Sequence, residues 1–129
     1  MTTVLVAGAT GYLGRFIVAD LHRRGLKVRA ITRSRERAVS PGPWGSPTLE
    51  GLVDAWAVGE VTDPDFVADT ARGVDAVVSA LGVTRQKADP WDVDYRANLA
   101  VLRSAERHGV TSFCFVNVIG GEQCPARLT

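Results

Sequence analysis

Hydrophobic residues alternate along this chain between two patterns. Short unbroken apolar runs, such as Val4 to Ala7, are typical of strands that are buried on both faces of a parallel sheet. Between the runs, apolar residues recur at spacings of three and four, as in Leu13, Phe16, Ile17 and Leu21, which predicts amphipathic helices. The expected strands are residues 3–8, 27–32, 54–59, 74–80 and 112–118, and the expected helices are residues 12–24, 63–73 and 90–109.

Glycine and proline mark where these segments end. Asp63 followed by Pro64 is a typical helix start, with the aspartate as N-cap and the proline in the first turn. Residues 38–48 contain three prolines and two glycines, which favours a loop over a continuous second helix. Within that loop, Ser46 followed by Pro47 is a candidate start for a short helix that would reach Gly51 or Leu52.

The alternation of five strands with helices predicts an α/β fold with a doubly wound parallel sheet. The expected strand order is 3-2-1-4-5, and residues 1–129 are expected to form one domain. Ligands of such sheets bind beyond the carboxyl ends of the strands, where the strand order reverses. We therefore expect a site between the first and fourth strands.

Three glycines at a spacing of three follow the first strand. Gly8 would let the chain turn sharply off the strand, Gly11 would keep side-chain atoms away from an approaching pyrophosphate, and Gly14 would let the helix pack close to the sheet. The helix start then offers free N–H groups and the positive end of its dipole to phosphates. The alternative is a purely structural tight turn, but the strand before and the helix after favour a phosphate cradle. The candidate contacts are Gly8, Thr10, Gly11, Tyr12, Leu13 and Gly14.

The run Gly-Ala-Thr-Gly-Tyr-Leu-Gly-Arg, residues 8–15, resembles the short-chain dehydrogenase/reductase superfamily. It is most similar to the atypical branch of NmrA-like and isoflavone-reductase-like NAD(P)-binding proteins. The resemblance extends along nearly the whole chain and stops abruptly at its end. It implies a Rossmann-type domain that is truncated after the fifth strand, with the family's substrate-binding part absent.

The end of the second strand indicates which dinucleotide is bound. An Asp or Glu about 20 residues past the glycines takes the ribose hydroxyls of NAD, whereas an arginine there suits a 2′-phosphate. Here the residues are Thr32, Arg33, Ser34 and Arg35, with no carboxylate before Glu36. Guanidinium and hydroxyl groups match phosphate chemistry, so NADP is favoured over NAD.

The resemblance adds two further candidate contacts with the dinucleotide. The run from Gly59 to Asp63 resembles the family's Gly-Asp-hydrophobic-Thr-Asp turn, which implies adenine contacts for Glu60 and Val61, although Glu60 stands where the family has aspartate. The run Ser79-Ala80-Leu81-Gly82 resembles the family's segment after the fourth strand. It implies that Ala80, Leu81 and Gly82 meet the nicotinamide ribose.

Composition narrows the remaining possibilities. A formal net charge of +1 gives no overall attraction to nucleic acid or membrane surfaces. There is no apolar run of membrane-spanning length, and the cytoplasm is the expected compartment. The two cysteines form no framework, Cys114 is expected to be buried, and two distant histidines make a metal site improbable.

Catalytic residues are not identifiable in this sequence. Classical relatives use a tyrosine with a lysine four residues later, but Tyr12 and Tyr95 are followed at that spacing by Phe16 and Leu99. Two functional classes stay open: the cofactor domain of an NADP-dependent oxidoreductase, and a non-catalytic NmrA-like redox sensor. A flavin- or nucleotide-sugar-binding relative is disfavoured by the arginines after the second strand. We expect NADP(H) binding without turnover of simple carbonyl substrates.

Self-association is a further expectation from the apolar fifth strand. The run from Phe113 to Val116 would leave an unpaired edge where relatives continue their sheet, and such edges recruit other strands. The chain is therefore expected to form homo-oligomers through this edge or through the helix at 90–108.

Overall fold

The computed structural model describes residues 2–81 and 90–116, with residues 90–94 described by their backbone alone. It contains a five-stranded, all-parallel sheet in the order β3-β2-β1-β4-β5, which confirms the predicted fold class. The strands are β1 (Thr3–Ala7), β2 (Lys27–Thr32), β3 (Ala55–Val58), β4 (Ala76–Ser79) and β5 (Phe113–Phe115). The helices are α1 (Tyr12–Arg23), α2 (Arg35–Ala38), the 3-10 turn η1 (Pro43–Gly45), α3 (Pro64–Val67) and α4 (Pro90–Arg107).

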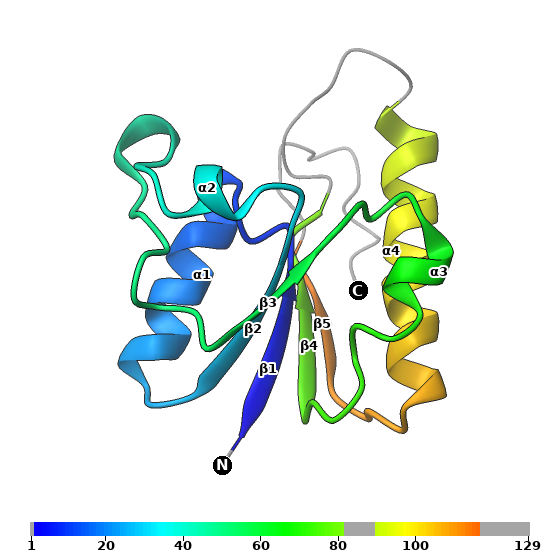
Figure 1. Ribbon diagram of the computed structural model, residues 1–129. Helices are drawn as coiled ribbons and strands as arrows, with labels where there is room; N and C mark the ends of the chain where they lie inside the picture. The colour runs from blue at the N-terminus through cyan, green and yellow to red at the C-terminus, as the bar shows by residue number, and fades with distance from the viewer. Residues whose placement is uncertain (1, 82–89, 117–129) are drawn as a thin grey trace.

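The helices form a layer on each face of the sheet. Helices α1 and α2 lie on one face, and α3 and α4 lie on the other (Figure 1). All five strands run in the same direction, so their carboxyl ends share one edge, and α1 begins at that edge. This arrangement places the glycine turn between β1 and α1 at the point where the strand order reverses.

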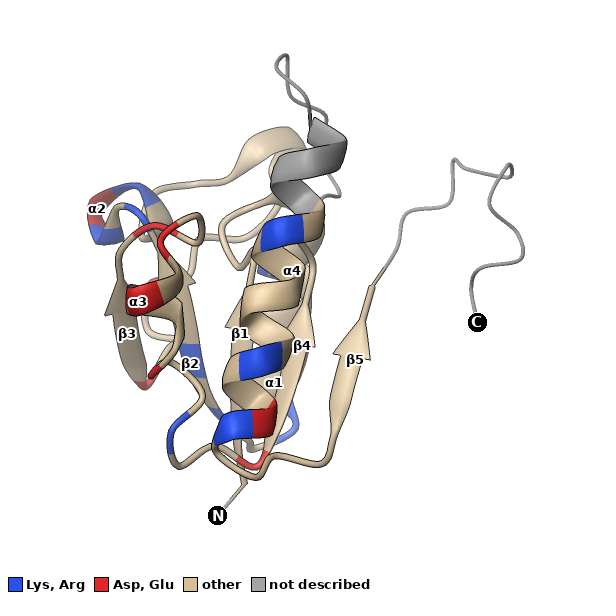
Figure 2. Cartoon of the chain, turned by 90° about the vertical axis from the view of Figure 1, so that its right-hand side faces the viewer, with Lys and Arg blue, Asp and Glu red and all other residues tan. Residues whose placement is uncertain are grey.

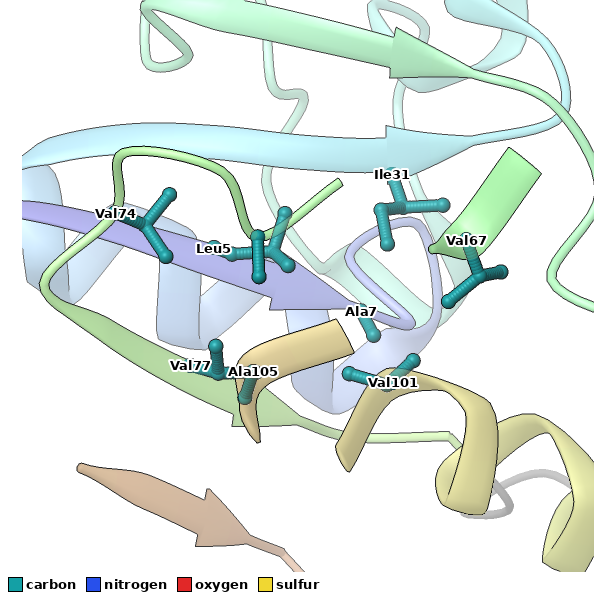
Figure 3. Close-up of a cluster of buried hydrophobic side chains, with 9 residues drawn as sticks. Leu5, Ala7, Ile31, Val67, Val74, Val77, Val101 and Ala105 are labelled. Atoms are coloured by element: carbon teal, nitrogen blue, oxygen red, sulfur yellow. The ribbon is translucent and has the colours of Figure 1, made fainter. Parts of the chain in front are cut away.

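Each face of the sheet has its own apolar core. Toward α3 and α4, Leu5 and Val77 of the sheet pack with Val67 and Val101, as Figure 3 shows. Toward α1, the buried cluster consists of Val4, Val6, Ala9, Val18, Val28, Ala30, Ala38 and Leu49. Because β1 contributes to both clusters, its continuous apolar run is the pattern that a central parallel strand requires.

The predicted helix at 63–73 is much shorter than expected. Asp63 caps α3 as predicted, since its carboxylate accepts a hydrogen bond from the Asp65 N–H at 3.0 Å. Beyond Val67, however, α4 takes over the backbone groups that a longer helix would use. The Ser104 hydroxyl accepts from the Ala71 N–H at 3.2 Å and donates to the Ala68 carbonyl at 3.0 Å. The chain therefore continues in turns toward β4.

The predicted helix after Ser46 does not form. Ser46 is buried, and its hydroxyl donates to the Pro43 carbonyl at 2.7 Å. The segment instead folds back on α2, because the Leu49 N–H donates to the Ala38 carbonyl at 3.1 Å. Ala38 ends α2, and residues 39–48 are otherwise the irregular connection that their prolines and glycines predicted, apart from the single turn η1.

The buried side of α1 is rotated from the predicted apolar stripe. Phe16 is 43% exposed, whereas Arg15 is only 4% exposed and Val18 is fully buried. Gly14 is also buried and lets the helix approach the sheet closely. Hydrophobic periodicity therefore placed an apolar residue inside and a charged residue outside, the reverse of what the structure has.

Strand β5 is the edge of the sheet in the described part of the chain. It pairs with β4 alone, with Val77 opposite Phe113 and Ser79 opposite Phe115. Cys114 is exposed, so the expectation that it is buried was wrong. The side chains of an edge strand have a neighbour on one side only, which an apolar run alone does not reveal.

Candidate functional site

The glycine turn leaves no room for side chains where β1 meets β4. Gly8 has a φ of 76°, a left-handed conformation that glycine adopts without strain. A Cβ on Gly8 would lie 2.8 Å from the carbonyl carbon of Ala80 and 2.9 Å from the Leu81 nitrogen. The turn is closed by a 3.3 Å hydrogen bond from the Gly11 N–H to the Gly8 carbonyl. The ends of β1 and β4 are therefore in direct contact at the predicted site.

Helix α1 begins inside this turn without a side-chain cap. Gly11 is the N-cap residue, with φ −76° and ψ 173°, and it supplies no side-chain acceptor. The first intrahelical bond is donated by the Arg15 N–H to the Gly11 carbonyl, at 3.0 Å. The N–H groups of Tyr12, Leu13 and Gly14 precede it and have no intrahelical acceptor. Such amides, together with the helix dipole, favour an anionic group.

The Tyr12 ring lies outside this row of amides. It packs edge-to-face against Phe16, with centroids 5.2 Å apart, and against Trp44, with centroids 5.9 Å apart. The contact joins the start of α1 to the η1 turn. Tyr12 therefore offers the site its backbone N–H, while its side chain anchors the loop.

At the end of β2, the predicted phosphate contacts occupy a tight turn. The Thr32 hydroxyl accepts from the Ser34 N–H at 3.1 Å and donates to the Ser34 carbonyl at 3.0 Å. Ser34 then caps α2 by accepting from the Arg37 N–H at 3.2 Å. Arg33 and Arg35 are exposed, and the Arg35 guanidinium lies 5.6 Å from the centroid of the Trp56 ring. That stacking orients Arg35 along β3.

The predicted adenine contacts lie at the end of β3. The Gly59 N–H donates to the Thr32 carbonyl at 2.9 Å, which joins this turn to the turn after β2. Glu60 is exposed, and Val61 packs partly buried against the core beneath α3. The structure thus places Glu60 and Val61 at the same edge of the sheet as the glycine turn, next to the tip of β2.

The segment after β4 is held by hydrogen bonds to α4. The Ser79 hydroxyl donates to the Asn98 side-chain carbonyl and accepts from the Leu81 N–H at 3.3 Å. Ala80 is 5% exposed, and its N–H donates to the Ala7 carbonyl at 2.9 Å. Of the predicted nicotinamide-side residues, Ala80 and Leu81 therefore meet Gly8, while Gly82 lies outside the described residues.

Sequence reasoning missed two residues that support this site. Asn98 ties α4 to the end of β4 through Ser79. Arg15 lies under the glycine turn, where its Nε donates to the Thr10 carbonyl at 2.8 Å. The available signal was their position in the helices. Asn98 stands three residues before the fully buried Val101 of α4, and Arg15 stands three residues before the fully buried Val18 of α1. A polar residue at such a spacing lies on the buried face and needs partners there.

These features fit a dinucleotide. The glycine turn and the amides of α1 would hold the pyrophosphate, the tip of β2 would face the adenosine ribose, and Ala80 and Leu81 would face the nicotinamide side. The nicotinamide of such a cofactor supplies hydride transfer when it is bound. Within the described residues, no group of three His, Cys, Asp or Glu side chains gathers as a metal site would.

The fold and the glycine turn define a nicotinamide-dinucleotide-binding Rossmann domain. The family model described as "NAD(P)H-binding" matches residues 8–128, and the chain belongs to that family. This membership confirms the resemblance to NAD(P)-binding short-chain dehydrogenase/reductase-like proteins.

Curated relatives include a reductase and an assembly factor. The chain is 40% identical over 123 residues to divinyl chlorophyllide a 8-vinyl-reductase of Zea mays, covering 92% of this chain and 30% of the maize protein. It is 29% identical over 125 residues to the photosystem II assembly factor Ycf39 of Synechocystis, covering 95% of this chain and 35% of that protein. The chain thus spans about a third of the length of these relatives.

Solved structures with the same fold contain NAD. UDP-glucose 4-epimerase from Bifidobacterium longum, determined with NAD⁺ and UDP, superposes with a TM-score of 0.70 at 19% identity, over 92% of this chain and 37% of the epimerase. Uronate dehydrogenase from Agrobacterium tumefaciens, complexed with NAD, gives a TM-score of 0.64 at 21% identity, over 90% of this chain and 40% of the enzyme. At these identities the likeness shows the fold alone.

Compartment is not decided by these comparisons. The maize reductase is named as chloroplastic, and Protein FMP52 of Chaetomium globosum, 31% identical over 124 residues, is named as mitochondrial. Within the described part of the chain, no helix has the length and apolarity needed to cross a bilayer. The expected cytoplasmic location stays a prediction.

A second surface feature lies away from the glycine turn, between α3 and α4. It is a groove of about 490 Å³ with an apolar floor that includes Leu99 and Ala100. Three arginines of α4 line it: Arg96, Arg103 and Arg107. Figure 2 shows the basic residues along α4, with an acidic segment on the neighbouring α3. The helix that was predicted to mediate self-association thus exposes a positively charged side.

Proposed function

We propose that this chain is the NADP(H)-binding domain of an oxidoreductase, with NADP(H) preferred over NAD(H). One observation carries the choice of cofactor: the tip of β2 has Arg33 and Arg35 and no carboxylate before Glu36. A carboxylate there would accept the ribose hydroxyls of NAD and repel a 2′-phosphate, whereas a guanidinium donates two parallel hydrogen bonds to a phosphate.

Arg33 and Arg35 have different parts in this proposal. Arg35 is stacked on Trp56, which restricts its side chain before any ligand arrives. Arg33 is exposed at the turn, and within the described part of the chain its guanidinium has no protein acceptor. We therefore assign the main contact with the 2′-phosphate to Arg33, with the Ser34 hydroxyl proton and Arg35 beside it.

Replacement of Arg33 tests the choice of cofactor. The native chain should bind NADPH at least tenfold more tightly than NADH, a difference of about 1.4 kcal/mol in binding free energy. Arg33→Ala should remove most of that preference, because the 2′-phosphate loses its bidentate partner while the pyrophosphate keeps its amides. Calorimetric titration with both dinucleotides measures the ratio of the two dissociation constants.

Arg107→Ala is the matched control, because it removes an exposed arginine from the far end of α4. It should leave the NADPH-to-NADH ratio within twofold of the native value. Equal affinities for the two dinucleotides in the native chain would refute the proposed cofactor specificity.

The comparisons favour an oxidoreductase over the redox-sensor alternative. The maize relative, at 40% identity, is named as a reductase, and the matched family is described by its nucleotide cofactor. We propose that hydride transfer is the reaction this domain serves. The sequence has no Tyr-x-x-x-Lys pair, so a proton donor of the classical type is not available within these 129 residues.

We also propose that the chain self-associates. Phe115 of β5 is 51% exposed on the edge strand, and an exposed apolar strand edge recruits another strand. At micromolar concentration, light scattering should show a dimer or larger species, and Phe115→Lys should shift it toward the monomer. Val58→Lys, at a similarly exposed position on the opposite edge strand β3, is the control and should leave the oligomeric state unchanged.

Arg103→Glu separates the two candidate surfaces. It reverses a charge in the groove on α4 and does not touch β5. If Arg103→Glu dissociates the oligomer and Phe115→Lys does not, the interface is α4. A native chain that scatters as a monomer would contradict both versions.

A further inference from the structure

Arg15 is a buried cation whose contacts run to two parts of the site. Its side chain is 4% exposed, and five backbone carbonyl oxygens accept hydrogen bonds from its guanidinium. Among the described residues, no carboxylate lies within ion-pair distance of it. Burial and the nearby Arg37 lower the pKa of Arg15 from its ordinary value, but an arginine stays protonated throughout the physiological range. Hydrogen bonds to these carbonyl groups offset the cost of burying the charge.

One end of the Arg15 guanidinium holds the glycine turn. Its Nε donates at 2.8 Å to the carbonyl of Thr10, which lies between Gly8 and Gly11. The turn itself has other supports, namely the Gly11-to-Gly8 hydrogen bond and the close packing of Gly14 against Gly8. The cradle can therefore keep its shape without Arg15.

The other end of the guanidinium holds the segment after β2. Nη2 donates to the Arg37 carbonyl at 3.1 Å, and Nη1 donates to the Ser40 carbonyl at 2.7 Å. The carbonyls of Ala38 and Pro47 complete the set, at 3.3 and 3.2 Å from Nη1. Arg37 and Ala38 form the last part of α2, a single turn whose first residue follows Ser34. Holding these carbonyls therefore holds the tip that carries Arg33.

Gly42 makes the space that Arg15 occupies. A Cβ on Gly42 would overlap the Ser46 hydroxyl oxygen and the Arg15 Cδ, and it would lie 2.6 Å from the Arg15 Nε. Gly42 has a φ of −90°, which any residue adopts, so conformational freedom does not explain the glycine. At Gly42 the loop therefore leaves room for the Arg15 side chain and for the Ser46 hydroxyl.

We propose that Arg15 is a positioning residue for coenzyme specificity: its guanidinium fixes the distance between the pyrophosphate cradle and the turn that binds the 2′-phosphate. This inference rests on the proposed preference for NADP(H). Apolar packing of Ala38 and Leu49 keeps α2 near the sheet, but it is non-directional, whereas five hydrogen bonds to fixed carbonyls set an orientation. The affinity for NADPH depends on that distance, because NADPH contacts both the cradle and the turn that binds the 2′-phosphate. The affinity for NADH does not, because NADH lacks the 2′-phosphate.

The test is the ratio of NADPH to NADH affinity in Arg15→Lys and Gly42→Ala. Lysine keeps the charge but has three donors on a single atom, so it cannot reach Thr10 and the α2 carbonyls together. Arg15→Lys should lower the ratio at least fivefold and change NADH affinity less than threefold. Gly42→Ala should lower the ratio to the same extent, because it displaces the Arg15 side chain. If Arg15→Lys does not fold, Gly42→Ala alone tests the proposal.

A double-mutant cycle separates positioning from a merely structural role. In an Arg33→Ala background, Arg15→Lys should leave the ratio unchanged, because the contact that it positions is already missing. Gly45→Ala disturbs the same loop through backbone strain, since Gly45 has a φ of 78°, but its Cβ would meet nothing within 4 Å. It should keep the ratio within twofold of the native value.

Three results would overturn the inference. One is an equal loss of NADPH and NADH affinity in Arg15→Lys, which would place the effect on the pyrophosphate or on the fold. The second is a loss of the ratio in Gly45→Ala as large as in Gly42→Ala. The third is an unchanged ratio in both Arg15→Lys and Gly42→Ala. If the native chain itself shows no preference, the proposed cofactor specificity fails first, and that outcome is visible without any variant.

Discussion

Gly14→Ala should lower the free energy of unfolding by about 3 kcal/mol and abolish dinucleotide binding. Alanine is normally the better helix former, by about 1 kcal/mol, so a gain in stability would be the ordinary result inside a helix. Here the added Cβ would overlap the carbonyl oxygen of Gly8 and lie 2.8 Å from its carbonyl carbon. Both groups belong to the backbone, so no side chain can rotate away, and α1 must separate from the turn.

Thermal unfolding followed by circular dichroism measures this effect. The midpoint should fall by roughly 10 °C for a chain of this size. Gly25→Ala is the control: its Cβ would meet nothing within 4 Å, and its φ of 82° makes the substitution cost only about 1–2 kcal/mol. Equal losses in the two variants would mean that the contact between Gly14 and Gly8 is not the cause.

Gly11→Val should abolish binding and leave the fold intact. The backbone of Gly11 is extended, with φ −76° and ψ 173°, and a β-branched residue adopts this conformation readily. Its N–H can still donate to the Gly8 carbonyl. The isopropyl group, however, would lie where the pyrophosphate must approach the amides of α1. Affinity for NADPH should fall at least a hundredfold, which is about 2.8 kcal/mol.

Calorimetry and circular dichroism on the same samples decide this prediction. Thr111→Val adds a valine at an exposed position before β5 and should bind like the native chain. A Gly11→Val variant that is folded and binds NADPH normally would show that the pyrophosphate lies elsewhere. Comparison with Gly14→Ala then separates the two functions of the glycine run, since one glycine serves the ligand and the other serves the fold.

Local patterns predicted the sheet well, because each strand carries its own signal. The apolar run of β2 predicted both of its end residues correctly. The strand order was predictable because the rules of chirality and connection leave few alternatives for five such strands. The glycine spacing likewise indicated a turn whose geometry the structure contains.

The predictions that were wrong concern residues whose hydrogen-bond partners are distant in the sequence. The helix after Asp63 was overestimated because Ser104, on α4, takes the hydrogen bonds that would extend it. Arg15 was missed because its five carbonyl partners, one in the glycine turn and four between Arg37 and Pro47, leave no local sequence signal. Hydrophobic periodicity predicts the buried side of a helix only where that side packs against apolar groups.

The contact between Gly8 and Ala80 also sets an order of events during synthesis. Strand β1 and its glycines leave the ribosome before β2, β3 and α3, and Ala80 and Leu81, which contact Gly8, follow only after those elements. Parallel pairing between β1 and β4 joins residues far apart in the chain, and such contacts form late because loop closure costs entropy. A nascent chain that ends before β4 would have the phosphate motif and no complete cradle, so the cofactor can stabilise only a molecule whose central strands have already paired.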